Sequence, residues 1–199
     1  MMRIDLSVEI KETQWNESLA KRTMTAFGHL GTHIDVMNKE FPLENAIRRG
    51  KIVDVSFVRG RVIETSDADL SEVSESNFVM FHTGYLNETG YGSEEYSGTH
   101  PQLSRQLIDF LLDRKVSMIG IDAAGIKRSG EHAQTDQYCA VHGVFVVENM
   151  ANLDRLNSAA GNAIYGLHIS HQPACCIRSA WQSDSGSPTV ERLRQVKAP

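Results

Sequence analysis

The sequence is poor in cysteine and contains no long apolar run. Its 199 residues include three cysteines, Cys139, Cys175 and Cys176, of which two are adjacent. No stretch approaches the roughly 20 apolar residues of a membrane-spanning helix, and the first residues carry no apolar segment typical of a signal peptide. These absences predict a reduced, cytoplasmic protein with no membrane segment, in which the cysteines are small buried hydrophobic residues.

An excess of positive charge is also missing. Lys and Arg together number 20 and Asp and Glu number 25, which gives a formal net charge of −5. The one basic cluster, Arg192, Arg194 and Lys197, lies near the C-terminus, whereas a nucleic-acid-binding protein normally presents a basic stripe. We therefore expect a small-molecule partner and no nucleic acid. With 41% hydrophobic residues, the composition excludes a disordered chain and fits one folded domain.

Several common catalytic and binding motifs are absent as well. The chain contains no Gly-x-Ser-x-Gly elbow, no phosphate-binding loop ending in Gly-Lys-Ser/Thr, no Gly-x-Gly-x-x-Gly fingerprint and no Cys-x-x-Cys pair. These absences count against a serine hydrolase of the α/β type, and against phosphate and dinucleotide binding.

The hydrophobic pattern predicts an α/β fold with many strands. Segments with strand-like alternation or short apolar runs are residues 4–10, 51–58, 77–81, 117–121, 144–147, 163–169 and 174–181. Helical patterns cover residues 101–115, 43–49, 67–73 and 134–141. Between a strand and a helix, residues 84–100 are rich in Gly, Tyr, Glu and Ser, and this segment is either a lid or a plain connector.

The densest group of metal-ligand side chains lies between His29 and Asp35. His29, His33 and Asp35 share one face if the segment is extended, because side chains alternate with a period of two. In a straight strand, however, the two histidines would lie about 13 Å apart, whereas metal–nitrogen distances are about 2.1 Å. The chain must therefore bend at Gly31, or the ligands must serve two adjacent ions. Imidazole with carboxylate suits Zn²⁺ or a harder ion such as Mn²⁺.

A second group of candidate residues lies far downstream. His132 and Asp136 are four residues apart, so on a helix they share a face. Glu148 directly follows the apolar run 144–147, and a carboxylate after a buried strand is a common position for a functional group. The alternatives are a solvated helix face for the first two residues and a surface ion pair for Glu148.

The segment from His29 to Asp35, His-Leu-Gly-Thr-His-Ile-Asp, resembles the metal-binding signature of the cyclase family. This family of metal-dependent hydrolases includes bacterial kynurenine formamidases and isatin hydrolases. Further blocks resemble the family in the same order, at residues 4–7, 78–85, 117–122 and 148–153. The resemblance implies one domain over residues 1–182, with a mixed, strand-rich sheet or barrel-like core and a few packed helices. Residues 183–199 then form a polar tail or arm.

By the same resemblance, His29, His33, Asp35 and Glu148 would be metal ligands. The family usually places a histidine twelve residues before this glutamate, a position that Asp136 occupies here. A carboxylate can replace imidazole as a ligand, which would give the site a harder character.

The signature continues in the family with a proline and a final histidine, which is taken as the catalytic acid/base. This chain has Met37 and Lys39 at these positions. If the chain stays extended past Asp35, Lys39 points to the same side as the ligands, and a nearby divalent ion would lower the pKa of its amine. Otherwise Lys39 pairs with Glu40 or Glu44 on the surface.

The resemblance implies a metal-dependent hydrolase that cleaves an amide, or a small cyclic amide or ester, with metal-activated water. Asp136 or Glu148 would hold the ion or orient the water, and Lys39 or His132 would transfer the proton. The alternatives are a homologue that binds metal or a small ligand without turnover, and a metal-free structural protein. The resemblance also implies a homodimer or homotetramer, for which tyrosines of residues 85–96 and Trp181 are candidate interface anchors.

Overall fold

The computed structural model describes residues 3–21, 29–157, 163–169 and 177–183, and eight strands of these segments form one mixed sheet. The predicted arm lies outside the described residues from 184 onward, as do Cys175 and Cys176. The strand order is β1-β8-β7-β3-β4-β5-β6-β2. The strands are β1 (Arg3–Asp5), β2 (His33–Asp35), β3 (Ile47–Asp54), β4 (Phe78–His82), β5 (Met118–Ile121), β6 (Phe145–Glu148), β7 (Ala163–Ile169) and β8 (Ile177–Ser183).

The centre of the sheet is parallel and its two flanks are antiparallel. Strands β3, β4, β5 and β6 run parallel to one another, whereas β2 pairs antiparallel with β6 and β7 pairs antiparallel with β3. Every residue of β4, β5 and β6 is buried, which explains why these segments appear in the sequence as continuous apolar runs. The prediction of an α/β fold with a mixed sheet is confirmed.

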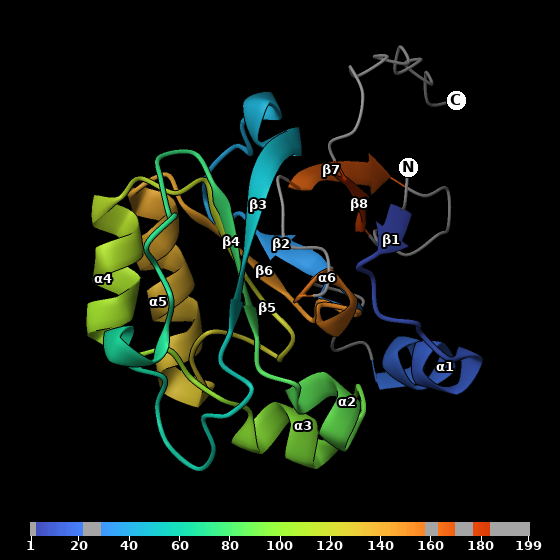
Figure 1. Cartoon of the computed structure of the whole chain (residues 1–199). Coiled ribbons are helices and arrows are strands. Elements are labelled where there is room, and N and C mark those ends of the chain that lie inside the picture. Colours follow the sequence, from blue (N-terminus) through green and yellow to red (C-terminus); the bar gives the residue numbers. More distant parts are fainter. Residues whose placement is uncertain (1–2, 22–28, 158–162, 170–176, 184–199) are drawn as a thin grey trace.

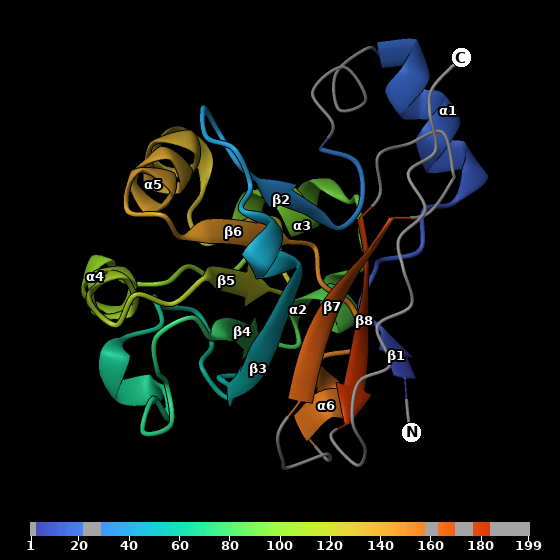
Figure 2. The ribbon, with the colours of Figure 1, turned by 90° about the horizontal axis from the view of Figure 1, so that it is seen from above.

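Helices cover one face of the parallel strands. In Figure 1, α4 (Arg105–Asp113) and α5 (Ser129–Val141) lie side by side against this face. Between the helices and the sheet lies a large apolar core that includes Leu107, Leu111 and Val146. A second apolar cluster, which includes Phe78, Met118 and Val147, lies on the other face. Figure 2 shows β1, β7 and β8 together at one side of the molecule, away from α4 and α5.

The predicted lid or connector at residues 84–100 is instead largely helical. It contains α2 (Tyr85–Thr89) and α3 (Glu94–Thr99), which lie next to each other in Figure 1. Ser93 caps α3, because its side chain accepts a hydrogen bond from the backbone N–H of Tyr96. Neither helix is long enough to show an apolar stripe in the sequence.

Other helix boundaries also differ from the predictions. The segment 43–49 forms only a 3₁₀ turn, η2 (Leu43–Ala46), because β3 begins at Ile47 and pairs with β7. The helix predicted at 67–73 is reduced to η3 (Thr65–Asp67). Two further helices, α1 (Glu12–Lys21) and α6 (Asp154–Asn157), were not expected. No helix among the described residues is long and apolar enough to cross a membrane.

A buried carboxylate forms hydrogen bonds that join the ends of strands β4 and β5. Asp122, which follows β5, accepts hydrogen bonds from the backbone N–H groups of Thr83 and Gly84 and from the Thr83 hydroxyl, at 2.7–2.8 Å. Burial raises the pKa of this carboxyl, and the three donors provide the partners that a buried acid requires. The Thr-Gly and Gly-Ile-Asp blocks thus have a structural role at the edge where the site is built.

Candidate metal centre

The first half of the candidate site is built by β2 and the bend that precedes it. His33 and Asp35 are two residues apart in the strand, so their side chains lie on the same face, and both are buried. Gly31 has a φ of 79°, a left-handed conformation that glycine adopts readily. The resulting bend brings the ring of His29 to 4.8 Å from that of His33, measured between centroids. Of the two alternatives that the spacing left open, a bend at Gly31 or two adjacent ions, the bend is therefore observed.

The second half comes from β6 and α5. His33 pairs directly with Glu148 in the antiparallel register, so these two side chains lie on the same face of the sheet. On this face α5 packs against β6 and presents His132 and Asp136 from its first two turns. The site thus lies where the parallel strand β6 ends, a position at which ligand sites of α/β sheets are common.

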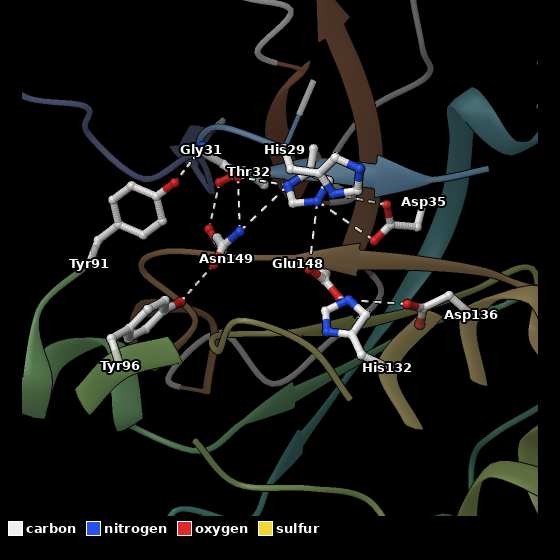
Figure 3. Close-up of polar contacts among 11 residues, drawn as sticks. His29, Gly31, Thr32, Asp35, Tyr91, Tyr96, His132, Asp136, Glu148 and Asn149 are labelled. Carbon is white, nitrogen blue, oxygen red and sulfur yellow. Dashed lines mark hydrogen bonds and ion pairs between the residues drawn. The ribbon is translucent and has the colours of Figure 1, made fainter. Parts of the chain in front are cut away.

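The structure brings together six of the seven predicted site residues (Figure 3). Nε2 of His33 lies 3.6 Å from Asp35 Oδ2 and 3.6 Å from Glu148 Oε2. Nε2 of His132 lies 3.1 Å from Asp136 Oδ2 and 3.0 Å from Glu148 Oε1. His29 contributes Nδ1, which is 3.6 Å from Asp35 Oδ1.

These residues form two adjacent sets of potential metal ligands. One contains His29, His33 and Asp35, and the other contains Asp35, His132, Asp136 and Glu148. Within each set the candidate ligand atoms lie within 4.8 Å of one another, and Asp35 belongs to both. Each set therefore has the dimensions of a site for one cation.

The electrostatics of the site favour a bound cation. Asp35, Asp136 and Glu148 are all at least 94% buried, and their ion pairs with described residues are formed with imidazoles rather than with Lys or Arg. Burial raises the pKa of Asp136 to about 8 and that of Glu148 to about 7, with the neighbouring carboxylates adding to both shifts. Three buried carboxylates with only imidazoles as partners are costly, and a divalent ion would supply further compensating charge.

Buried polar atoms of these same side chains that lack a hydrogen-bond partner are a second indication of a cation site. Among the residues that the structure describes, four buried atoms of the site have no hydrogen-bond partner of normal geometry, namely His33 Nε2, Asp35 Oδ2, Asp136 Oδ1 and Glu148 Oε1. Buried polar groups are normally hydrogen-bonded, and ligand atoms that face a cation are a familiar exception. The residues present therefore fit a divalent metal centre.

His132 lies with the ligands rather than apart from them. The Glu148 carboxylate, whose Oε1 lies 3.0 Å from Nε2 of His132, raises the pKa of His132 to about 9. Its Nε2 atom is directed at two carboxylates, which is the geometry of a ligand in the second set. Its side chain is 28% exposed and that of His29 is 46% exposed, so solvent reaches the site beside these two imidazoles.

Lys39 does not lie on an extended continuation of β2, as the alternation argument had assumed. The strand ends at Asp35, Met37 has a left-handed φ of 53°, and the Lys39 N–H donates to the carbonyl of Val36 at 3.0 Å. Lys39 is exposed in this turn, so the premise that placed it beside the ligands is wrong. The structure shows no ion pair of Lys39 with Glu40 or Glu44 either.

A polar network behind His33 was missed by the sequence reasoning. Nδ1 of His33 lies 2.9 Å from the Gly31 carbonyl, which also accepts a hydrogen bond from the Asn149 amide at 3.0 Å. The Thr32 hydroxyl donates to the backbone carbonyl of Asn149 at 2.6 Å. Tyr96, a candidate interface anchor, is only 1% exposed and belongs to this network. Only the Glu-Asn pair of residues 148–149 could have indicated it.

Comparisons with known proteins identify related sequences and folds. The family model described as "Putative cyclase" matches residues 4–128. The kynurenine formamidase of Bacillus cereus is 26% identical over 153 residues, which cover 70% of this chain and 68% of that protein. A solved potential metal-dependent hydrolase with cyclase activity has a TM-score of 0.66 at 22% identity and covers 90% of this chain and 96% of its own. Isatin hydrolase A from Labrenzia aggregata, bound to benzyl benzoate, has a TM-score of 0.61 at 18% identity over 79% of this chain and 74% of its own.

Proposed function

The chain belongs to the cyclase family, and from this premise we propose that it is a metal-dependent hydrolase that cleaves an amide or a small cyclic amide or ester. The observation that carries the proposal is the convergence of three buried carboxylates and three imidazoles at the end of β6. The kynurenine formamidase and isatin hydrolase relatives suggest aryl formamides and cyclic amides as substrate classes.

The ligand sets suggest which residues would hold the metal. His29, His33 and Asp35 would hold one ion, and Asp35, His132, Asp136 and Glu148 would hold an ion at the second position. A divalent ion in such surroundings polarises a carbonyl group and provides hydroxide from water near neutral pH. The first set, with two imidazoles, suits Zn²⁺, whereas the carboxylate-rich second set suits Mn²⁺.

The burial of the site indicates how a substrate would approach. The carboxylates of Asp35, Asp136 and Glu148 are buried, whereas His29 and His132 are partly open to solvent. A substrate carbonyl would therefore enter beside the two imidazoles. The buried carboxylates would stay in fixed positions during the reaction, and their burial would keep water away from that side of the site.

Two residues, His132 and Lys39, are candidates for transferring the proton to the leaving group. His132 lies in the site, but its Nε2 atom is directed at the carboxylates, so a ligand role competes with an acid/base role. Lys39, the other candidate, is exposed in the turn after β2 rather than on an extended continuation of the ligand strand.

The exposed Lys39 favours a second candidate function, a homologue that binds metal but does not turn over substrate. Turnover on aryl formamides, isatin and simple lactones, measured after loading with Zn²⁺ or Mn²⁺, separates the two candidates. The hydrolase proposal predicts metal-dependent turnover on at least one of these classes, and the second candidate predicts metal binding without it.

A pair of variants tests the ligand assignment itself. We expect His33→Ala and His132→Ala to lower bound metal to a similar extent, because both Nε2 atoms are directed at carboxylates. Metal content is measured by elemental analysis of each purified variant beside the wild type. A His132→Ala variant that keeps its full metal content would remove His132 from the ligand set and leave it free to transfer protons.

A further inference from the structure

We propose that Tyr91 and Tyr96 are positioning residues that hold the ligand His33 in the orientation needed for metal binding. The inference rests on the proposed metal centre. It assigns a role to residues 85–99, which the hydrolytic chemistry does not otherwise use. Both tyrosines act on the bend at Gly31, one directly and the other through Asn149 (Figure 3).

The peptide groups of Gly31 are held on both sides. Its N–H donates to the phenol oxygen of Tyr91 at 2.7 Å. Its carbonyl accepts from the amide of Asn149 at 3.0 Å and from Nδ1 of His33 at 2.9 Å. Because Gly31 carries the left-handed φ that creates the bend, these bonds fix the point at which the chain turns into β2.

The direction of each hydrogen bond follows from chemistry. A carbonyl can only accept, so Asn149 must present its NH₂ group to Gly31 and its oxygen to Tyr96. The Tyr96 hydroxyl donates to that oxygen at 2.9 Å. Nδ1 of His33 lies 2.9 Å from the Gly31 carbonyl and 3.5 Å from the Asn149 amide nitrogen, and the shorter contact, to a group that can only accept, assigns the proton to Nδ1. The unprotonated nitrogen is then Nε2, the atom that faces Asp35 and Glu148.

The tyrosines themselves have little freedom to move. Tyr96 is 1% exposed, and burial raises the pKa of its phenol, which remains a neutral donor. Its ring stacks with Tyr85 at 5.9 Å and meets Tyr91 edge-on at 5.7 Å, between centroids. Residues 85–99 therefore form a rigid support from which two phenols reach the ligand strand. Partners of this kind behind a metal-binding histidine set its tautomer and its orientation.

Calorimetric titration of metal-free protein with Zn²⁺ and with Mn²⁺ tests the proposal. We expect Tyr96→Phe and Tyr91→Phe each to weaken binding by about 10- to 100-fold, the usual cost of losing such a partner. Tyr85→Phe is the matched control, because its phenol bonds Glu95 and Thr99 within the same helices and does not reach Gly31. Tyr96→Phe and Tyr91→Phe variants that bind both metals as tightly as Tyr85→Phe would overturn the proposal.

Nitrogen NMR of the histidine side chains provides a second readout that does not depend on metal binding or on the folding of any variant. In metal-free wild type at a pH where His33 is neutral, the proposal predicts a proton on Nδ1 and none on Nε2. The opposite tautomer would overturn the positioning role. Wild-type protein that binds neither metal would instead refute the metal centre, while the tautomer measurement still decides the role of the network.

Discussion

Replacement of Gly125 by alanine is the sharpest single perturbation of the site. Gly125 lies in the loop between β5 and α5, with a φ of 146°, and its backbone passes against two candidate ligands. An added Cβ would lie 2.8 Å from Cε1 and 3.0 Å from Nδ1 of His132, and 3.0 Å from Oε1 of Glu148. Unstrained carbon contacts are about 3.5–4.0 Å, so the His132 ring must move by about 0.7 Å or more.

The size of the effect follows from this displacement. Functional constellations tolerate a misplacement of about 0.5 Å, and losing the support of a metal ligand typically costs about 10- to 100-fold in affinity. We therefore expect Gly125→Ala to weaken metal binding by about 10- to 100-fold, which is about 1.4–2.8 kcal/mol. The assay is calorimetric titration of metal-free protein at a temperature well below unfolding.

Three control variants separate ligand displacement from other effects of the substitution. Gly60 and Gly90 also have positive φ values but have no atom within 4 Å of an added Cβ, so their alanine variants report backbone strain alone. Gly130→Ala adds a methyl group to α5 near His132, again without a close contact. If Gly125→Ala bound metal as tightly as these three controls, the placement of His132 in the ligand set would be refuted.

The remaining predictions concern pH, Lys39 and assembly. The pKa values of Glu148, Asp136 and His132, raised to about 7, 8 and 9, mean that the folded metal-free protein binds more protons than the unfolded chain. Its free energy of unfolding should therefore fall as the pH rises from about 4, near the ordinary pKa values of the carboxyls, to about 9. Metal affinity should rise between about pH 6 and pH 9, because the folded ligands must lose their protons to bind. Denaturation with chelator at several pH values checks this, and metal-free stability that rises with pH would contradict it. If Lys39 transfers protons, Lys39→Ala should lower turnover by about 100- to 10,000-fold with metal content unchanged; near-normal turnover would exclude it. We also propose a homodimer or homotetramer, which a light-scattering mass of 22.1 kDa, that of one chain, would contradict.

Much of the site followed from local sequence patterns. The alternation of His33 and Asp35, the helical spacing of His132 and Asp136, and a carboxylate directly after a buried strand each depend on the periodicity of one element. A bend at Gly31 was one of the two arrangements that followed from a distance that a straight strand could not bridge, the other being two adjacent ions. These predictions needed no knowledge of distant contacts.

The remaining features depended on interactions that no local pattern shows. Lys39 was misplaced because a non-glycine residue, Met37, adopts a left-handed conformation that ends the alternation. The helices α2 and α3 are too short for an apolar period to appear. Tyr96 looked like a surface anchor, because its partner Asn149 lies 53 residues away in the sequence. Hydrogen bonds across such separations become evident only when the chain is folded.

Elemental analysis of protein purified without chelator tests the central claim most directly. Three buried carboxylates beside three imidazoles should retain about one equivalent or more of zinc or manganese per chain. Less than about 0.1 equivalent, even after incubation with added metal and removal of the excess, would contradict the metal centre.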